Sequence, residues 1–385
     1  MKSTSLASIE PHFASLPDPR TGPAQRHNFI DILVIAICAI ICGADGWVAV
    51  EAFGKAKYDW MKSLLQLPNG VPSHDTFTRV FRALNPQQFE RCFFDWVKTV
   101  SQLTEGEIIP IDGKQLRRSH DNEDGKAAIH LVSAWSSANG LALAQVKVDA
   151  KSNEITAIPK LLEVLDLKGC IITIDAMGCQ TEIAAKIVEQ ESDYVLALKK
   201  NQGHLYEDVE FLFDDLTHNP DVDSYDDCDL DSAQTVEKDH GRIETREAFS
   251  LSGADCIASL RNASEFANFK MVVKVTAERD INDEVSVESR YYISSLDGNA
   301  SQLLDATRTH WGIENGVHWV LDIAFREDEC RIRKGNGAEN FAILRRIALN
   351  RLKQDNSVKL GIHNKRLNAA WDNDYLMKIL STLFY

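Results

Sequence analysis

Three acidic residues stand where a fold can hold charge beside a buried core. Asp112 ends an apolar run at residues 108–111, and Asp175 ends a second run at residues 171–174. Glu314 closes the segment His-Trp-Gly-Ile-Glu much further along the chain. Carboxylates on strand ends and on a helix are hard oxygen ligands for divalent cations. We therefore predict that these acids bind metal and support metal-assisted phosphoryl transfer.

The chemistry of a phosphodiester predicts the number of ions. Its negative charge repels a nucleophile, and two ions roughly 3.5–4 Å apart overcome this by activating a water or hydroxyl and stabilising the leaving oxygen. Carboxylates on separate elements, with few histidines, favour two Mg²⁺ or Mn²⁺ ions. Because His310, Glu314 and His318 would share one helix face, a histidine-based transition-metal site is an alternative. For each acid taken alone, the alternative to a metal-binding role is that of an ordinary turn, helix-cap or solvated residue.

The first hundred residues are expected to be helical. Helix formers separated by Gly and Pro predict helices at residues 29–41, 47–65, 73–84 and 86–100, with Ser73 as an N-cap. Short helices with tight turns fit a helix-turn-helix DNA reader, and they fit plain packing equally well.

From Glu107 onward the sequence pattern predicts strands and helices in place of helices alone. The predicted order is three strands (107–112, 128–136, 141–148), a helix (155–165), a strand (170–175), a helix (181–190) and a strand (194–198). This is the order of a ribonuclease H-like α/β sheet. In that layout the strand ending at Asp175 lies beside the strand bearing Asp112.

Composition and charge divide the remainder of the chain. Residues 205–239 hold thirteen acids and one lysine, which is −12 of the formal net charge of −15. Residues 331–334 and 345–353 are basic by contrast, so the overall charge does not exclude a polyanion partner. We expect an N-terminal helical accessory domain at 1–104, for which DNA binding is one candidate role. The catalytic core spans 105–200 and 289–385, with a mainly β insertion at 201–288 and helices at the C-terminus.

Length and cysteine usage indicate a folded cytosolic protein. The chain has 385 residues, 44% of them hydrophobic, which is enough for a large core. Eight cysteines without a Cys-x-x-Cys pair argue against a zinc site and a secreted disulfide framework. The most apolar stretch, residues 29–42, is shorter than the roughly 20 residues of a membrane span and contains Asp31. We expect a buried helix there, no targeting signal and no membrane partner.

Seven short segments in order resemble one family. They are Leu-Pro-Asp-Pro-Arg (16–20), Pro-Ser-His-Asp-Thr-Phe (72–77), Ile-Asp-Gly-Lys (111–114), Asp-Ala-Met-Gly-Cys-Gln (175–180), Leu-Lys-Lys-Asn-Gln (198–202), His-Gly-Arg-Ile-Glu (240–244) and His-Trp-Gly-Ile-Glu-Asn (310–315). With them the chain resembles DDE transposases of bacterial insertion sequences, most closely the H-repeat-associated proteins found with Rhs elements.

The resemblance implies a ribonuclease H-like enzyme that cuts DNA at transposon ends and joins it to a target. Its metal ligands would be Asp112, Asp175 and Glu314. Its partners would be double-stranded DNA and at least one further copy of the chain in a synaptic complex, in the cytoplasm at the nucleoid. The broader family often places Tyr, Arg and Lys around its Glu. Here those slots hold Thr307, His310 and Leu321.

Basic residues near the predicted acids and in the insertion are candidates for gripping DNA, with an ordinary solvated charge as the alternative for each. The candidates are Lys114, Arg117, Arg118, Lys199, Lys200, His240, Arg242, Arg308, His318, Arg333 and Lys334. Two other functions stay open at this point. The altered slots around Glu314 fit a catalytically decayed DNA-binding protein, and the acids alone also fit a nuclease that cleaves without joining.

Overall fold

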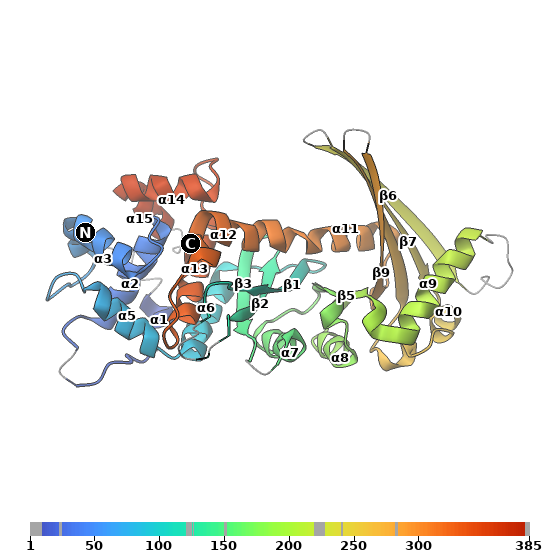
Figure 1. Cartoon of the computed structure of the whole chain (residues 1–385), viewed down its shortest axis with the longest axis horizontal. Coiled ribbons are helices and arrows are strands. Elements are labelled where there is room, and N and C mark those ends of the chain that lie inside the picture. The colour runs from blue at the N-terminus through green and yellow to red at the C-terminus, as the bar shows by residue number, and fades with distance from the viewer. Residues whose placement is uncertain are drawn as a thin grey trace.

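The computed structural model describes residues 10–22, 25–120, 125, 127–149, 152–218, 228–239, 242–281 and 284–381. The protein is elongated, with helices from both ends of the chain at one end, a central sheet between helices, and a long β ribbon at the other end (Figure 1). In the described part of the chain, no helix has both the length and the apolar character needed to cross a membrane.

The N-terminal region is helical, as predicted. Its helices are α1 (Glu10–Phe13), α2 (Phe29–Ile41), α3 (Trp47–Ala56), α4 (Tyr58–Leu64), α5 (His74–Ala83) and α6 (Pro86–Val100). Helix α2 is buried along almost its whole length, which confirms the prediction for this apolar stretch. The single helix expected at 47–65 is two helices that meet at Lys57. Ser73 occupies the N-cap of α5, as expected.

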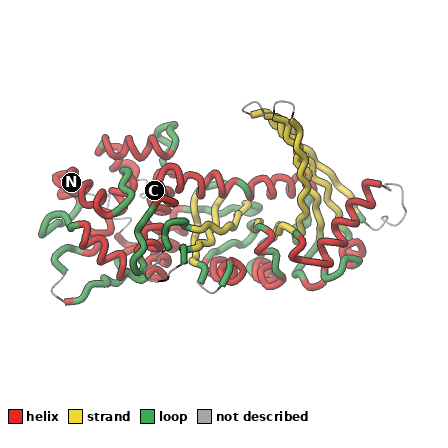
Figure 2. The backbone as a smooth tube through the Cα atoms, in the orientation of Figure 1, coloured by secondary structure: helices red, strands yellow, loops and turns green. Residues whose placement is uncertain are grey.

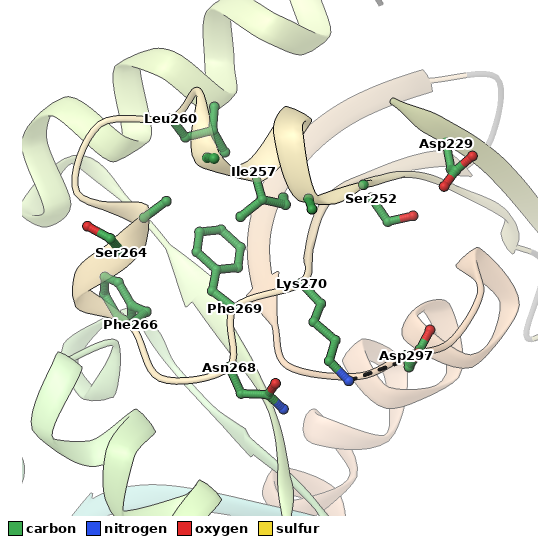
Figure 3. A pocket seen from close by; sticks show the side chains of 14 residues that line it. Asp229, Ser252, Ile257, Leu260, Ser264, Phe266, Asn268, Phe269, Lys270 and Asp297 are labelled. Carbon is green, nitrogen blue, oxygen red and sulfur yellow. Dashed lines mark ion pairs between the residues drawn. The ribbon is translucent and has the colours of Figure 1, made fainter. Parts of the chain in front are cut away.

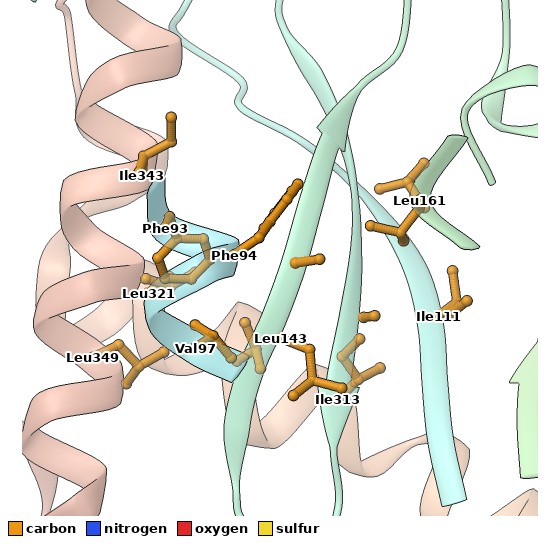
Figure 4. Packing of buried hydrophobic residues seen from close by; sticks show 14 of the residues in the cluster. Phe93, Phe94, Val97, Ile111, Leu143, Leu161, Ile313, Leu321, Ile343 and Leu349 are labelled. Carbon is orange, nitrogen blue, oxygen red and sulfur yellow. The ribbon is translucent and has the colours of Figure 1, made fainter. Parts of the chain in front are cut away.

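Helices from the C-terminus pack against these N-terminal helices. They are α13 (Gly337–Gln354), α14 (Ile362–Trp371) and α15 (Asn373–Ser381). Asn340 on α13 donates to the carbonyls of Phe81 (2.7 Å) and Leu84 (3.0 Å), and Phe341 meets Trp47 edge-on. Figure 4 shows Ile343 of α13 in the same apolar cluster as Phe93 of α6 and residues of the sheet. Both ends of the chain therefore share one hydrophobic core.

The central sheet has the five predicted strands, but the first continues to Gln115, so Asp112 lies within this strand and not, as we had predicted, at its end. Its strands are β1 (Ile108–Gln115), β2 (His130–Ser136), β3 (Leu141–Lys147), β4 (Ile171–Ile174) and β5 (Asp193–Leu198). They lie in the order β3-β2-β1-β4-β5, antiparallel across β3, β2 and β1 and parallel across β1, β4 and β5. Ile111 pairs with Ile174, so the strands that carry Asp112 and Asp175 are neighbours, as expected.

Helices cover both faces of this sheet, which explains why its central strands are continuously apolar. Helices α7 (Glu154–Val164) and α8 (Thr181–Glu189) lie on one face, and α11 (Ala300–His310) with α12 (Trp319–Phe325) lies on the other (Figure 1). Ile172 of β4 joins the larger core cluster, whereas Ile171 packs with Leu303 of α11.

Four long strands extend the same sheet beyond β5, and we call them the wing. They are β6 (Asp229–Asp239), β7 (Arg242–Ser252), β8 (Met271–Ile281) and β9 (Glu284–Ser294). Neighbouring strands are antiparallel, and β9 pairs with β5, so the whole sheet has nine strands. Figure 2 shows the wing as a twisted ribbon that leaves the core on the side of α11.

The segment before the wing departs from the mainly β structure predicted for residues 201–288. It contains α9 (Gly203–His218), a helix of 16 residues. Leu205, Val209, Leu212 and Phe213 are its buried residues, and their spacing is that of one apolar helix face. Acidic residues fill the opposite face, and they dominate the local composition from which the prediction was made.

The base of the wing contains a disulfide that the cysteine pattern did not predict. Cys228 is bonded to Cys256 on the short helix α10 (Ala254–Ala258), whereas the other six cysteines are free thiols. A cavity of about 630 Å³ opens beside α10 (Figure 3), and there Lys270 pairs with Asp297 at 3.9 Å. None of the predicted site residues lines this cavity.

Candidate active site

Asp175 is held at the end of β4 by the turn that follows it. Its Oδ1 accepts the backbone N–H groups of Met177 (3.1 Å) and Gly178 (3.4 Å), so it caps a short 3-10 helix. Gly178 is needed because a Cβ at this position would lie 2.3 Å from Cγ2 of Ile174. The glycine of the Asp-Ala-Met-Gly motif thus lets the turn pack directly on the strand.

The Leu-Lys-Lys-Asn-Gln motif after β5 supports the same turn. Asn201 Nδ2 donates to the carbonyl of Ala176 at 2.8 Å, and Gln202 Nε2 donates to the carbonyl of Cys179. Two motifs that lie apart in the sequence are therefore one structural unit, and their shared role is to fix the position of Asp175.

Glu314 lies in a continuous helical path that runs from α11 to α12. A π-helical turn, Glu314–His318, links the two helices. A Cβ on Gly312 would come 2.8 Å from the ring of Trp135, and one on Gly316 would come 3.0 Å from it. The two glycines therefore allow this helix to lie directly against β2, and that close approach places Glu314 over the strand that carries Asp112.

The structure brings Asp112, Glu314 and His318 into one cluster. His318 Nδ1 lies 3.0 Å from Oε2 of Glu314 and 3.4 Å from Oδ2 of Asp112, and one potential ligand atom from each residue lies within 4.8 Å of the others. His318 is 3% exposed, whereas Glu314 is open to solvent. Asp175 is on the neighbouring strand but falls outside this tight group of three.

The electrostatics of Asp112 are those of a carboxylate that lacks a positive partner. Burial, together with the charges of Asp175, Glu154 and Glu314, raises the pKa of Asp112 to about 7. Within the described residues, no lysine or arginine pairs with Asp112, Asp175 or Glu314. Converging carboxylates with no basic counterpart are an arrangement that a divalent cation stabilises.

The two histidines of this segment have separate surroundings. His310 Nδ1 lies 3.0 Å from the hydroxyl of Thr173 and takes no part in the cluster, so the face expected to join His310, Glu314 and His318 holds only the last two. Burial lowers the pKa of His310 to about 4 and also lowers the pKa of His318. Both rings are therefore neutral at pH 7.

A fourth acid near the cluster is Glu154, the first residue of α7, which we did not predict. Its Oε1 lies 2.7 Å from Nε2 of His130 and would be 2.0 Å from a Cβ on Gly113. Burial and the charge of Asp175 raise its pKa to about 6. The glycine after Asp112 thus leaves room for this carboxylate, and the only sequence signal was an acid in the first turn of a helix.

Comparison with known protein families shows to which family the chain belongs. Residues 98–351 match the model of the transposase DDE domain, and residues 11–97 match the model of the DDE_Tnp_1-associated region. The chain belongs to the DDE transposase family.

Members of this family from Escherichia coli are similar over almost the whole chain. The chain is 40% identical to the "H repeat-associated putative transposase YhhI" of strain K12 over 385 residues, which cover 98% of each protein. It is 40% identical to the "Putative transposase YncI" of O157:H7 over 381 residues, which cover 98% of this chain and 95% of that protein. A piggyBac transposase synaptic complex is similar with a TM-score of 0.44 and 13% identity, covering 98% of this chain and 75% of that one.

Lys114 and His318, which we predicted as DNA contacts of this transposase-family chain, are inside the protein. Lys114 is 9% exposed, and its Nζ pairs with Asp322 and donates to the carbonyl of His318 at 3.1 Å. Glu327, fully enclosed, lies 3.5 Å from the same ammonium. DNA cannot reach these groups, so we revise the role of Lys114 to that of a positioning residue behind the cluster.

The remaining basic candidates occupy different surfaces. Lys199 and Lys200 are exposed and line a hollow of about 530 Å³ together with Asp175 and Trp311. Arg308 is exposed on α11 and pairs with Glu237 of the wing.

Four further candidates lie in the segment just after β1 and in the segment before α13. Arg117 pairs with Asp328 at 3.2 Å, Arg333 Nε donates to the carbonyl of Arg118 at 3.0 Å, and Lys334 is exposed. His240 and the side chain of Arg242 lie outside the described residues.

The three slots around Glu314 in which the family often places Tyr, Arg and Lys do not face solvent in this chain. Thr307, His310 and Leu321 are all buried. The hydroxyl of Thr307 donates to the carbonyl of Leu304 at 2.9 Å, and Leu321 belongs to the core. Lys199 and Lys200, by contrast, are exposed and line the same hollow as Asp175.

Proposed function

We propose that this protein is a DNA transposase that cleaves the ends of its insertion sequence and joins them to target DNA. The observation that carries the proposal is the approach of Asp112, Glu314 and His318 to within 4.8 Å beside the strand that carries Asp175. The strand order β3-β2-β1-β4-β5 further supports a ribonuclease H-like core for this reaction.

The residues present fit two Mg²⁺ or Mn²⁺ ions. Asp112 lies on the strand beside Asp175 and approaches His318 together with Glu314, so the three carboxylates would hold the ions. When bound, the ions would activate the attacking water or 3′-hydroxyl and stabilise the leaving oxygen. No covalent protein intermediate is needed, because water and then the freed 3′-hydroxyl are the nucleophiles.

The protein's own contribution is to hold these carboxylates rigid and to present DNA to them. The turn at 176–178 fixes Asp175, and the helix packed on Trp135 fixes Glu314. Lys199 and Lys200 are exposed beside Asp175 and are placed to meet the backbone phosphates of the bound strand. We propose that the protein acts on double-stranded DNA, as a complex of two or more copies, in the cytoplasm at the nucleoid.

The direct test is cleavage of duplexes that carry the inverted repeats flanking the coding region. Asp112→Asn and Asp175→Asn should each lower cleavage by more than about 10³-fold, because each removes a metal-binding charge while keeping the shape of the side chain. Binding of the same duplex should persist. Asp305→Asn, an exposed acid on α11, is the matched control and should cleave normally. Normal cleavage by either active-site variant would refute the proposal.

A strand-transfer assay separates the transposase from the two alternative functions. Precut ends with a free 3′-hydroxyl are supplied together with supercoiled target DNA, and joined products are counted. A transposase gives joined products that depend on Asp112. Cleavage without any joining would indicate a nuclease, and binding without either reaction would indicate a decayed DNA-binding protein.

A further inference from the structure

We propose that His318 is a metal ligand, through Nδ1, of the ion shared by Asp112 and Glu314, and that this nitrogen makes the site favour Mn²⁺ over Mg²⁺. The inference rests on the proposed function, because it concerns an ion of the same centre. It adds a ligand of a different chemical kind to the three carboxylates.

The distances in the cluster are those of neighbouring ligands around one ion. In an octahedral site with bonds of roughly 2.1 Å, adjacent ligand atoms lie roughly 3.0 Å apart. His318 Nδ1 lies 3.0 Å from Oε2 of Glu314 and 3.4 Å from Oδ2 of Asp112. One ring nitrogen thus faces two carboxylate oxygens at once, whereas a single N–H could donate well to only one of them.

The surrounding fold fixes the position of His318. Lys114 donates to the main-chain carbonyl of His318 at 3.1 Å, and Lys114 is itself fixed by Asp322. Gly316, two residues earlier, brings this turn against the ring of Trp135. His318 is 3% exposed, and in the described chain its Nε2 has no hydrogen-bond partner, so Nδ1 is the nitrogen directed at the carboxylates.

His310 provides a matched contrast within the same segment. It lies eight positions earlier and is also buried, but its Nδ1 lies 3.0 Å from the hydroxyl of Thr173. Burial of a histidine in this helix therefore does not by itself direct the ring at the acids. Among the described histidines, His318 alone combines burial with contact to both Asp112 and Glu314.

The donor set predicts which ion is preferred. Mg²⁺ is a hard cation that favours oxygen ligands and keeps several waters. Carboxylate oxygens suit Mn²⁺ as well, but Mn²⁺ belongs to the transition-metal affinity series and, being softer than Mg²⁺, it gains more from one imidazole nitrogen among its ligands. The full chain without DNA should therefore bind Mn²⁺ more tightly than Mg²⁺. His318→Gln should weaken Mn²⁺ about tenfold, and should weaken Mg²⁺ less, because water can replace the lost nitrogen.

The decisive experiment is pulsed electron paramagnetic resonance of Mn²⁺ bound to the full-length protein. The wild type should give a nitrogen coupling that changes when the protein carries ¹⁵N-histidine, and His318→Gln at saturating Mn²⁺ should lose it. His310→Gln should keep it. Circular dichroism checks that both variants are folded, and the wild-type spectrum alone tests the claim if neither is.

The outcomes separate this inference from the proposed function. Bound Mn²⁺ without a nitrogen coupling in the wild type would overturn the role of His318 and leave a carboxylate site intact. A coupling that survives in His318→Gln would overturn it as well. Absence of any Mn²⁺ binding that depends on Asp112 would overturn the proposed metal centre itself.

Discussion

A buried acidic residue of the wing is paired with basic residues, whereas the acids at the end of the sheet that carries Asp112 and Asp175, here called the catalytic end, are not. In the wing, Glu244 is 3% exposed and contacts Arg246 at 2.7 Å and Arg279 at 2.8 Å. Asp112 lies within β1 and Asp175 directly follows β4, and the charges of Asp175 and Glu314 both act on Asp112. No arginine or lysine of the described chain pairs with any of these three acids. Paired charges make a structural network, whereas like charges left to converge imply a cation from outside.

After replacement of the acids themselves, the largest expected effect comes from moving the helix that carries Glu314. A methyl group on Gly316 would lie 3.0 Å from the ring of Trp135, so Gly316→Ala should shift Glu314 away from Asp112. A displacement near 1 Å in an active site costs roughly 10²-fold in rate. Cleavage kinetics measure this, and Gly361→Ala, with open space around it, is the control. Wild-type rates in Gly316→Ala would show that the close approach does not position the acid.

Substitutions in the wing should change the stability of the protein and not the rate of DNA cleavage. Glu244→Gln leaves Arg246 and Arg279 without their buried partner, and the free energy of unfolding should fall by about 2 kcal/mol. Denaturant titration measures the loss. Glu247→Gln, on the opposite face of the same strand, should change it little. Equal losses in both variants would mean that the Glu244 network is not the stabilising feature.

Glu154 extends the contrast to a fourth acid at the catalytic end. Its carboxylate lies beside Gly113, so its charge should add to the attraction for a cation at Asp112. Glu154→Gln should weaken Mn²⁺ binding about tenfold in calorimetric titration. The control is Glu163→Gln, an exposed acid of the same helix that pairs with Lys186. Unchanged Mn²⁺ affinity in Glu154→Gln would restrict the centre to the predicted acids and His318.

A smaller effect, on thermal stability, is expected at Glu90, which lies near another acid and outside the proposed metal site. Burial and the charge of Glu339 raise the pKa of Glu90 to about 8. A raised pKa in the folded state means that the stabilising proton is fully present below the ordinary pKa of 4.5 and is lost as pH rises through about 8.

The variant Glu90→Gln should therefore melt about 2–4 °C higher than the wild type at pH 9. At pH 4.5 the two proteins should melt together, because the wild-type carboxyl is protonated there. Melting curves across this pH range provide the measurement, and parallel profiles would contradict the assignment.

Much of the catalytic half of the fold could be predicted from local pattern. The apolar runs before Asp112 and Asp175 predicted strands of a buried sheet, and the structure shows that these strands are parallel and that helices cover both faces of the sheet (Figure 1). The helix at 29–41 was likewise predictable from its apolar length. The prediction that the strands carrying Asp112 and Asp175 are neighbours came from the order of strands and helices, which matched a ribonuclease H-like layout, and the parallel pairing of β1 with β4 confirms it.

The rest depended on contacts between distant segments, which local pattern does not encode. Nothing near Lys114 in the sequence indicates that Asp322 and His318 enclose its ammonium. The partnership of Cys228 with Cys256 likewise requires the fold of the wing base. The helix α9 did carry a signal, its buried Leu205-to-Phe213 spacing, which the surrounding acids obscured.

The most direct test of the central claim is anomalous diffraction from crystals of the full-length protein grown with Mn²⁺. The account predicts a manganese peak within about 2.6 Å of carboxylate oxygens of both Asp112 and Glu314. That peak should disappear in Asp112→Asn. Ordered manganese found only elsewhere on the protein, with these two carboxylates free of it, would contradict the account.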